Sequence, residues 1–176
     1  MLSPVPAVLA TCRYNGKDNI ITIAWTGTIC SQPPMLYISV TPQRYSYKMI
    51  KETGVFAINI PDKKIVKETD LCGVLSGKNC DKFHETGFTK AKAEKIDVPL
   101  IAECPINIEC DVEQEVELGS HTMFIAEVLG VSVAERLIDN NNRIAFDDAK
   151  LFSYAHGHYY QLGKQLGHFG YSVKKK

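Results

Sequence analysis

The stretch from residue 19 to residue 40 reads NIITIAWTGTICSQPPMLYISV, two apolar segments joined by a polar, tightly turned junction. The junction holds the one tryptophan of the chain, Trp25, followed by a glycine, a Cys-Ser pair and two prolines. Side chains two residues apart share a face of a strand, which puts Thr22, Ala24 and Thr26 together on a small, hydroxyl-bearing face. Such a face lets a flat ring lie against the backbone, and its hydroxyls can hydrogen-bond the edge of that ring.

The strand pattern around this stretch predicts an antiparallel sheet. Alternating or β-branched apolar segments bounded by turn residues predict strands over residues 7–14, 19–26, 35–40, 55–60, 106–119 and 121–135. Asn15-Gly16 is a hairpin turn signal, and Gly119-Ser120 forms the tip of a long hairpin. Many strands joined by short turns predict a mainly β fold, a closed or partly closed antiparallel barrel decorated with helices.

Helices are expected between these strands. Residues 44–53 have helical spacing and end at Gly54, which suits a left-handed helix stop. Residues 62–77 predict a second helix, capped by Asp62. Residues 78–99 predict a compact loop or short helix, and the Tyr- and Gly-rich tail over 145–172 has Leu and Gly spaced as for packing on a surface.

Composition favours one globular domain over residues 1–176, with 45% hydrophobic and 23% charged residues. Twenty basic and twenty acidic residues give no electrostatic bias toward nucleic acid or an anionic membrane. The terminal Lys174–Lys176 is expected to be solvated. No apolar run approaches bilayer length and the N-terminus has no basic region before its short apolar run, so we expect a cytoplasmic protein.

The six cysteines are expected to be reduced, because none of them forms a C-x-x-C pair and the chain shows no export signal. Free cysteine is usually a small buried hydrophobe. Cys30 is the exception that needs a second interpretation, because it lies in the junction described above.

Several classes of site are excluded because the sequence lacks their motifs. The sequence has no G-x-G-x-x-G after a strand, no phosphate-binding P-loop and no G-x-S-x-G nucleophile turn. His156 and His158 would share a face if they lay on a strand, but the spacing supplies no third ligand, and we predict no metal site.

Arg44 and Ser46 form the best candidate for an anion site. An arginine beside the first amides of a helix has the composition of a phosphate site in a chain without a P-loop. The alternative is that Ser46 only caps the helix and Arg44 lies in water, because capping is the commoner role of such a serine.

In its ordered set of short motifs the chain resembles the flavin reductase-like family, the FMN-binding split-barrel proteins that include flavoredoxins. The motifs in chain order are Asn19, Thr22, AWTG (24–27), SQPP (31–34), Ser39-Val40, Arg44, Ser46, TGVFAINIP (53–61), SGKNCDKF (76–83), GSHTMFIAEV (119–128) and YYQLGKQLG (159–167). The resemblance thus covers nearly the whole chain.

The resemblance implies a split β-barrel that forms a homodimer and binds FMN near the subunit interface. It implies that Thr22, Ala24, Trp25 and Thr26 line the flavin and that Ser39 and Val40 contact the ring through their backbone. It further implies that Arg44 and Ser46 hold the phosphate and that Lys82 is another cofactor contact, while Asn19 is part of the motif that carries the site.

Two residues are candidates for catalysis, each with an open alternative. By resemblance His121 would lie near the ring face where hydride arrives; otherwise it is a strand histidine beside a hairpin turn. Cys30 would be redox-active if it lay beside the flavin with a lowered thiol pKa; otherwise it is a small buried residue in a turn.

The predicted function is an NAD(P)H-dependent flavin reductase, in which NADH or NADPH gives hydride to FMN. A flavoredoxin-type electron carrier, exchanging electrons with protein partners, is the alternative. A third possibility is a flavin-binding module without catalysis. In the reductase and in the carrier, the cofactor would supply the redox chemistry and the protein its orientation.

Overall fold

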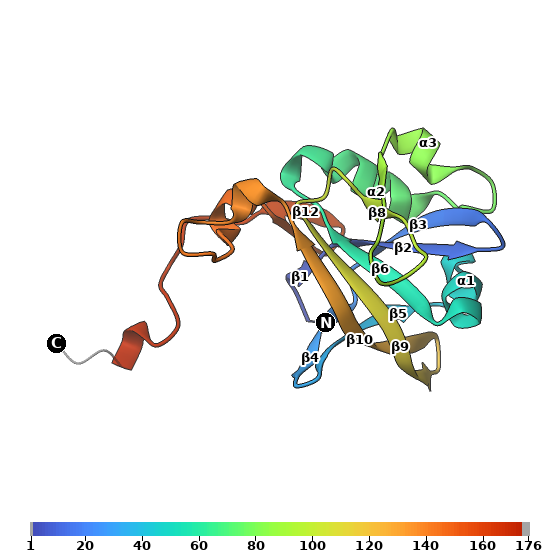
Figure 1. Ribbon diagram of the computed structural model, residues 1–176, viewed down its shortest axis with the longest axis horizontal. Coiled ribbons are helices and arrows are strands. Elements are labelled where there is room, and N and C mark those ends of the chain that lie inside the picture. Colours follow the sequence, from blue (N-terminus) through green and yellow to red (C-terminus); the bar gives the residue numbers. More distant parts are fainter. Residues whose placement is uncertain (1, 174–176) are drawn as a thin grey trace.

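The computed structural model describes residues 2–173, and the predicted solvated end at Lys174–Lys176 lies outside them. A seven-stranded antiparallel sheet forms the body of the molecule in the order β3-β2-β6-β9-β10-β5-β4 (Figure 1). Its strands are Val8–Tyr14 (β2), Lys17–Ile23 (β3), Thr26–Ser31 (β4), Pro34–Val40 (β5), Val55–Ile60 (β6), Ile106–Leu118 (β9) and His121–Val133 (β10). Apart from the strand predicted over residues 19–26, the predicted strands are confirmed, as are both hairpins, with two-residue turns at Asn15-Gly16 and Gly119-Ser120.

The barrel closes at the polar junction between the two apolar segments of residues 19–40. The prediction of one strand over residues 19–26 is wrong: β3 ends at Ile23, and the chain bends at Ala24 and Trp25 before β4 begins. β3 pairs with β2, whereas β4 pairs with β5, so the two ends of the sheet are consecutive in the chain. The Ser39 amide donates to the Trp25 carbonyl at 2.9 Å, which fastens β5 to the bend. The polar junction therefore joins the two edges of a split barrel.

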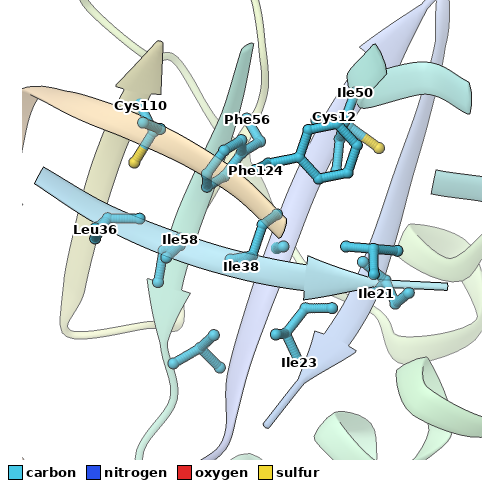
Figure 2. Close-up of a cluster of buried hydrophobic side chains, with 14 of the residues drawn as sticks. Cys12, Ile21, Ile23, Leu36, Ile38, Ile50, Phe56, Ile58, Cys110 and Phe124 are labelled. Carbon is cyan, nitrogen blue, oxygen red and sulfur yellow. The ribbon is translucent and has the colours of Figure 1, made fainter. Parts of the chain in front are cut away.

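The barrel interior is apolar and tightly filled. Side chains from β2, β3, β5, β6, β10 and the first helix form one cluster, shown in Figure 2 with Phe56, Phe124, Ile38 and Ile50 among its fully buried members. Burying side chains of this size stabilises the fold by roughly 1.5–3 kcal/mol each. In β5 the side chains of Leu36, Ile38 and Val40 point into the barrel, so the residues between them point outward.

The helices cover the ends and one side of the barrel (Figure 1). Helix α1 spans Tyr45–Thr53 and ends as predicted at Gly54, which has φ 70°. The single helix predicted over 62–77 is instead a 3-10 turn, Lys63–Ile65, followed by α2, Val66–Val74. Asp62 caps the 3-10 turn, where its carboxylate accepts the Lys64 amide. The following segment holds the short helix α3, Lys82–Thr86, and a two-stranded sheet of β7, Lys90–Ala91, and β8, Leu100–Ile101.

The C-terminal part differs from the prediction. A second sheet pairs β11, Phe152–Ala155, with β12, His158–Gln161, and with β1, Val5–Pro6, near the N-terminus. His156 occupies the turn of this hairpin with φ 47°, so it does not share a strand face with His158. Two further 3-10 turns, Glu135–Leu137 and Phe146–Ala149, lead into the hairpin, and a last one spans Tyr171–Val173. Within residues 2–173 no helix is long and apolar enough to cross a membrane.

Candidate functional site

A cleft of about 390 Å³ opens beside the bend that closes the barrel. Three parts of the chain form its walls: the end of β3 with the bend and the end of β5, the last turns of α2, and the β11–β12 hairpin. The lining residues are Ile21, Thr22, Ile23, Ala24, Trp25, Ser39, Val40, Thr41, Arg44, Asp70, Gly73, Val74, His121, Tyr154, Gly157 and Tyr159. Segments about 130 residues apart in the chain therefore meet at one opening.

One end of the cleft is aromatic. The rings of Trp25 and His121 lie 4.5 Å apart between centroids, at an interplanar angle of 34°. Ser120 Oγ lies 2.9 Å from His121 Nδ1, so the imidazole is held by its neighbour as well as by the indole. The backbone of Trp25 lies at the bend that joins the two edges of the barrel. Its indole lies outside the core and is 47% exposed. The exposed indole therefore forms an apolar wall of the cleft.

Arg44 lines both the cleft and a smaller neighbouring cavity. It precedes α1 as the N-cap residue, and its guanidinium Nη1 donates to the carbonyl of Gly73 at 3.1 Å. No side chain caps the first amides of α1, and the Arg44 side chain is exposed. A fixed cation beside uncapped helix amides can hold an anion.

A smaller cavity of about 120 Å³ adjoins the cleft at Ile21 and Arg44. It is polar, and its lining includes Asn19, Ser46, Ser76, Gly77 and Lys82. Ser46 is 1% exposed and does not cap the helix; instead its hydroxyl accepts a hydrogen bond from Asn19 Nδ2 at 2.7 Å.

Gly77 and Asn19 are in close contact. A Cβ at position 77 would lie 2.0 Å from Asn19 Oδ1, so the amide can occupy its position only because residue 77 has no side chain. Gly77, three residues after the end of α2, thus has a packing role at the small cavity.

Lys82 is buried under the same cavity. Its ammonium donates to the carbonyls of Ile20 and Cys72, both at 2.7 Å, and the residue is 3% exposed. Burial lowers the pKa of Lys82 from its ordinary value. An ammonium has three donors, so one remains after these two contacts.

The β11–β12 hairpin is joined to α2 across the cleft. Tyr159 donates its hydroxyl to Asp70 Oδ1 at 3.0 Å, and the Tyr154 ring lies 5.4 Å from the Tyr159 ring. Burial, and next the hydrogen bond to Asp70, raise the pKa of Tyr159. The hydroxyl therefore remains a donor throughout the neutral range.

The structure brings most of the predicted site residues together. Those that line the cleft are Thr22, Ala24, Trp25, Ser39, Val40, Arg44 and His121. Those that line the small cavity are Asn19, Arg44, Ser46 and Lys82. Thr26 and Cys30 line neither cavity; the Thr26 hydroxyl donates to the Tyr37 carbonyl, and Cys30 Sγ lies 3.4 Å from the Gln32 carbonyl near the β4–β5 turn.

The sequence reasoning missed Asp70 and Gly73 on α2 and Tyr154 and Tyr159 on the hairpin. The Tyr-rich composition of the tail was the one available signal, because tyrosine pairs on a short hairpin are suited to line a binding surface. The position of the hairpin depends on its pairing with β1, which no local pattern reveals.

All six cysteines are free in the structure. Cys12, Cys72, Cys104 and Cys110 are buried, and Cys30 and Cys80 are partly exposed. Burial raises the pKa of Cys12 to about 12 and that of Cys72 to about 11, which keeps these two thiols protonated and unreactive.

Comparison with known proteins identifies the family and the fold of the chain. Residues 1–163 match the family described as "Flavin reductase like domain". Flavoredoxin of Desulfovibrio vulgaris (Miyazaki F) superposes with a TM-score of 0.93 at 32% identity, covering 99% of this chain and 95% of that one. Flavoredoxin from Methanosarcina acetivorans gives 0.90 at 27% identity, with 99% and 95% covered.

A sequence relative from Archaeoglobus fulgidus carries the name of an enzyme. The ferric-chelate reductase (NAD(P)H) of that organism is 23% identical over 157 residues, covering 89% of this chain and 85% of the relative. The predicted antiparallel split barrel is confirmed by the flavoredoxin structures and by a split-barrel structure from Shewanella frigidimarina, which superposes with a TM-score of 0.85 at 19% identity, covering 95% of this chain and 86% of that one. With its match over residues 1–163, the chain belongs to the flavin reductase-like family.

Proposed function

We propose that the cleft binds FMN, with the flavin ring at the Trp25–His121 end and the phosphate at the small cavity. The observation that carries this proposal is the pairing of the two cavities: an open aromatic one and a small polar one, which adjoin at Ile21 and Arg44. A ligand with a flat ring at one end and a phosphate at the other matches both cavities.

The residues present fit this cofactor. The small cavity offers two cations, Arg44 and Lys82, and the hydroxyls of Ser46 and Ser76, the donor set that a phosphate prefers. The cleft combines aromatic rings with residues whose small or absent side chains leave room, namely Ala24 and Gly73. Its volume of about 390 Å³ falls within the range of small-molecule sites, roughly 300–1,000 Å³.

The proposed activity is that of an oxidoreductase, in particular an NAD(P)H-dependent flavin reductase. When bound, FMN supplies the capacity to accept hydride. The chain's own residues anchor the phosphate, orient the ring against the β3–β4 bend, and leave the cleft open for a nicotinamide. The relative named ferric-chelate reductase (NAD(P)H) supports a nicotinamide donor, and His121 is proposed to adjoin the reacting face.

A flavoredoxin-type electron carrier is the second candidate. The flavoredoxin structures superpose with TM-scores of 0.93 and 0.90, and this likeness favours the carrier. A carrier would hold FMN tightly and exchange electrons with protein partners rather than with NADH or NADPH.

The test is a visible absorption spectrum of the purified protein, reconstituted with FMN where needed, before and after anaerobic addition of NADH or NADPH. A flavin spectrum that bleaches supports the reductase. A flavin spectrum that neither nucleotide changes, but that dithionite bleaches, favours the carrier. Failure to bind added FMN rejects both functions.

The phosphate assignment has a separate test. Titration with riboflavin, which lacks the phosphate, should give much weaker binding than titration with FMN, because the two cations then lose their partner. Equal affinities would contradict the role of Arg44 and Lys82.

We also propose that the protein forms a homodimer. The resemblance to the family implies a dimer with the flavin near the subunit interface, and the open side of the cleft beside the exposed Trp25 supports a second copy there.

A further inference from the structure

The C-terminal segment, residues 162–173, leaves its own barrel with its apolar side chains uncovered. After β12 the chain leads away from the body of the molecule (Figure 1). Leu166 is 96% exposed and Phe169 106%, and Leu162, Tyr171 and Val173 are exposed as well. An exposed apolar series of this kind marks an interaction site, because removing it from water would stabilise a complex.

This segment nevertheless has local order. Gln165 Nε2 donates to the Gly167 carbonyl at 2.9 Å, and the Tyr171 amide donates to the His168 carbonyl at 3.0 Å. A Cβ at position 167 would lie 2.7 Å from the Tyr171 ring, so the ring folds over a glycine. A segment that is turned and hydrogen-bonded without covering its own core is shaped for another surface, since preorganisation lowers the cost of binding.

The barrel carries an apolar surface that no part of its own chain covers fully. In β10, Thr122, Phe124 and Ala126 are buried inward, so Met123 and Ile125 point outward. Ile125 pairs with Tyr37 of β5, and the outward Met35 of β5 pairs with Glu127. These outward residues, Met35, Tyr37, Met123 and Ile125, are partly exposed and form what we term the outer face.

We propose that the C-terminal segment of one copy docks on the outer face of a second copy of the same chain. A second copy is the partner that symmetry favours. In a two-fold dimer each copy places its segment on the outer face of the other, so both segments and both outer faces are covered. The segment leads away from the body of its own chain, which leaves its apolar side chains free to contact a neighbouring copy (Figure 1). Lys164 of the segment and Glu127 beside the outer face supply opposite charges.

This inference rests on the proposed homodimer and adds the segment that holds it together. It does not depend on FMN, because neither the segment nor the outer face lines the cleft.

Two measurements test it on the full chain. Sedimentation of the wild-type protein should give a dimer, and the double variant Leu166→Glu with Phe169→Glu should raise the dissociation constant at least tenfold. The matched control is Leu2→Glu, which adds a charge at another apolar side chain that is 88% exposed. Because all three positions are exposed, each variant should retain the circular dichroism spectrum of the wild type, and only the double variant should lower the melting temperature, through loss of the dimer.

The second measurement locates the contact. A photo-crosslinking benzoylphenylalanine at position 169 should convert the 19.6 kDa chain to a covalent dimer on a denaturing gel, with the link mapped by mass spectrometry to β5 or β10. A wild-type monomer at every concentration would overturn both the homodimer and the docking segment. A dimer that resists the double variant, or that crosslinks within one chain or elsewhere, would overturn the docking segment alone.

Discussion

The two ends of the candidate flavin site are built in different ways. At the small cavity Asn19, Ser46 and Lys82 are 1–3% exposed and hydrogen-bonded to each other or to the backbone of β3 and α2. At the aromatic end Trp25 is 47% exposed, and Tyr159 reaches across from a short hairpin. The first end is part of the barrel wall, while the second is assembled from surface elements.

The difference corresponds to the two tasks that a flavin site has. Anchoring a phosphate needs donors that do not move, and burial of polar groups in a complete hydrogen-bond network fixes them. Exchanging electrons with a second molecule needs an accessible ring face. We therefore expect changes that disturb the buried Asn19, Ser46 or Lys82 to act on affinity and folding together, and changes at the aromatic end to act on the bound ring.

The largest effect on the cofactor is expected for Arg44→Ala. The variant should weaken FMN binding by about 1.5–3 kcal/mol, because one charge-assisted hydrogen bond to the phosphate is lost. Isothermal titration would measure the FMN affinity. Since Arg44 is exposed, the melting temperature without flavin should change little.

Riboflavin provides the internal control for that variant. Its affinity should be the same for Arg44→Ala and for the wild type, because riboflavin has no phosphate. An unchanged FMN affinity would remove Arg44 from the site.

Gly77→Ala should affect folding and binding together. The new Cβ would collide with Asn19 Oδ1, and overpacking of this kind costs roughly 1–3 kcal/mol of unfolding free energy. Asn19 would have to move away from Ser46, so FMN affinity should fall too. Urea denaturation and flavin titration measure the two effects, and Gly163→Ala, where no atom lies within 4 Å of a new Cβ, is the control. Equal stability of both variants would refute the close contact.

Tyr159→Phe should have a smaller effect at the aromatic end. The hydrogen bond to Asp70 is exposed to solvent, and losing it should cost about 0.5–1.5 kcal/mol. We expect faster dissociation of FMN, measured by stopped-flow fluorescence, since the hairpin then opens more readily.

Burial of Tyr159, and next its hydrogen bond to Asp70, predict a pH dependence of stability. The folded-state pKa of Tyr159 is raised above the ordinary value of 10.0, so its contribution to stability is complete below pH 10.0 and declines as the pH rises toward the folded-state value. Tyr159→Phe should remove this alkaline component from the stability profile. If the two profiles run parallel, Tyr159 and Asp70 are not coupled in solution.

The sequence permitted the buried end to be predicted better than the aromatic end. Asn19, Arg44, Ser46 and Lys82 lie in or beside regular elements whose patterns are local, so their neighbourhood follows once the strands and helices are placed. Tyr159 and Asp70 are 89 residues apart, and their contact depends on a hairpin whose partner is the two-residue strand β1. The bend at Trp25 was also missed, because alternation continues in the sequence through residue 26 while the backbone changes its pairing partner.

The smallest effect is expected for Cys30→Ser. Cys30 is partly exposed in β4, lines neither cavity, and its thiol contacts the Gln32 carbonyl, so a hydroxyl can occupy the same position. FMN affinity and the rate of flavin reduction should be those of the wild type, measured by titration and by anaerobic stopped-flow absorbance. A slower reduction with unchanged affinity would assign Cys30 to the redox chemistry. That result would also extend the reactive end of the site beyond the cleft, to the turn between β4 and β5.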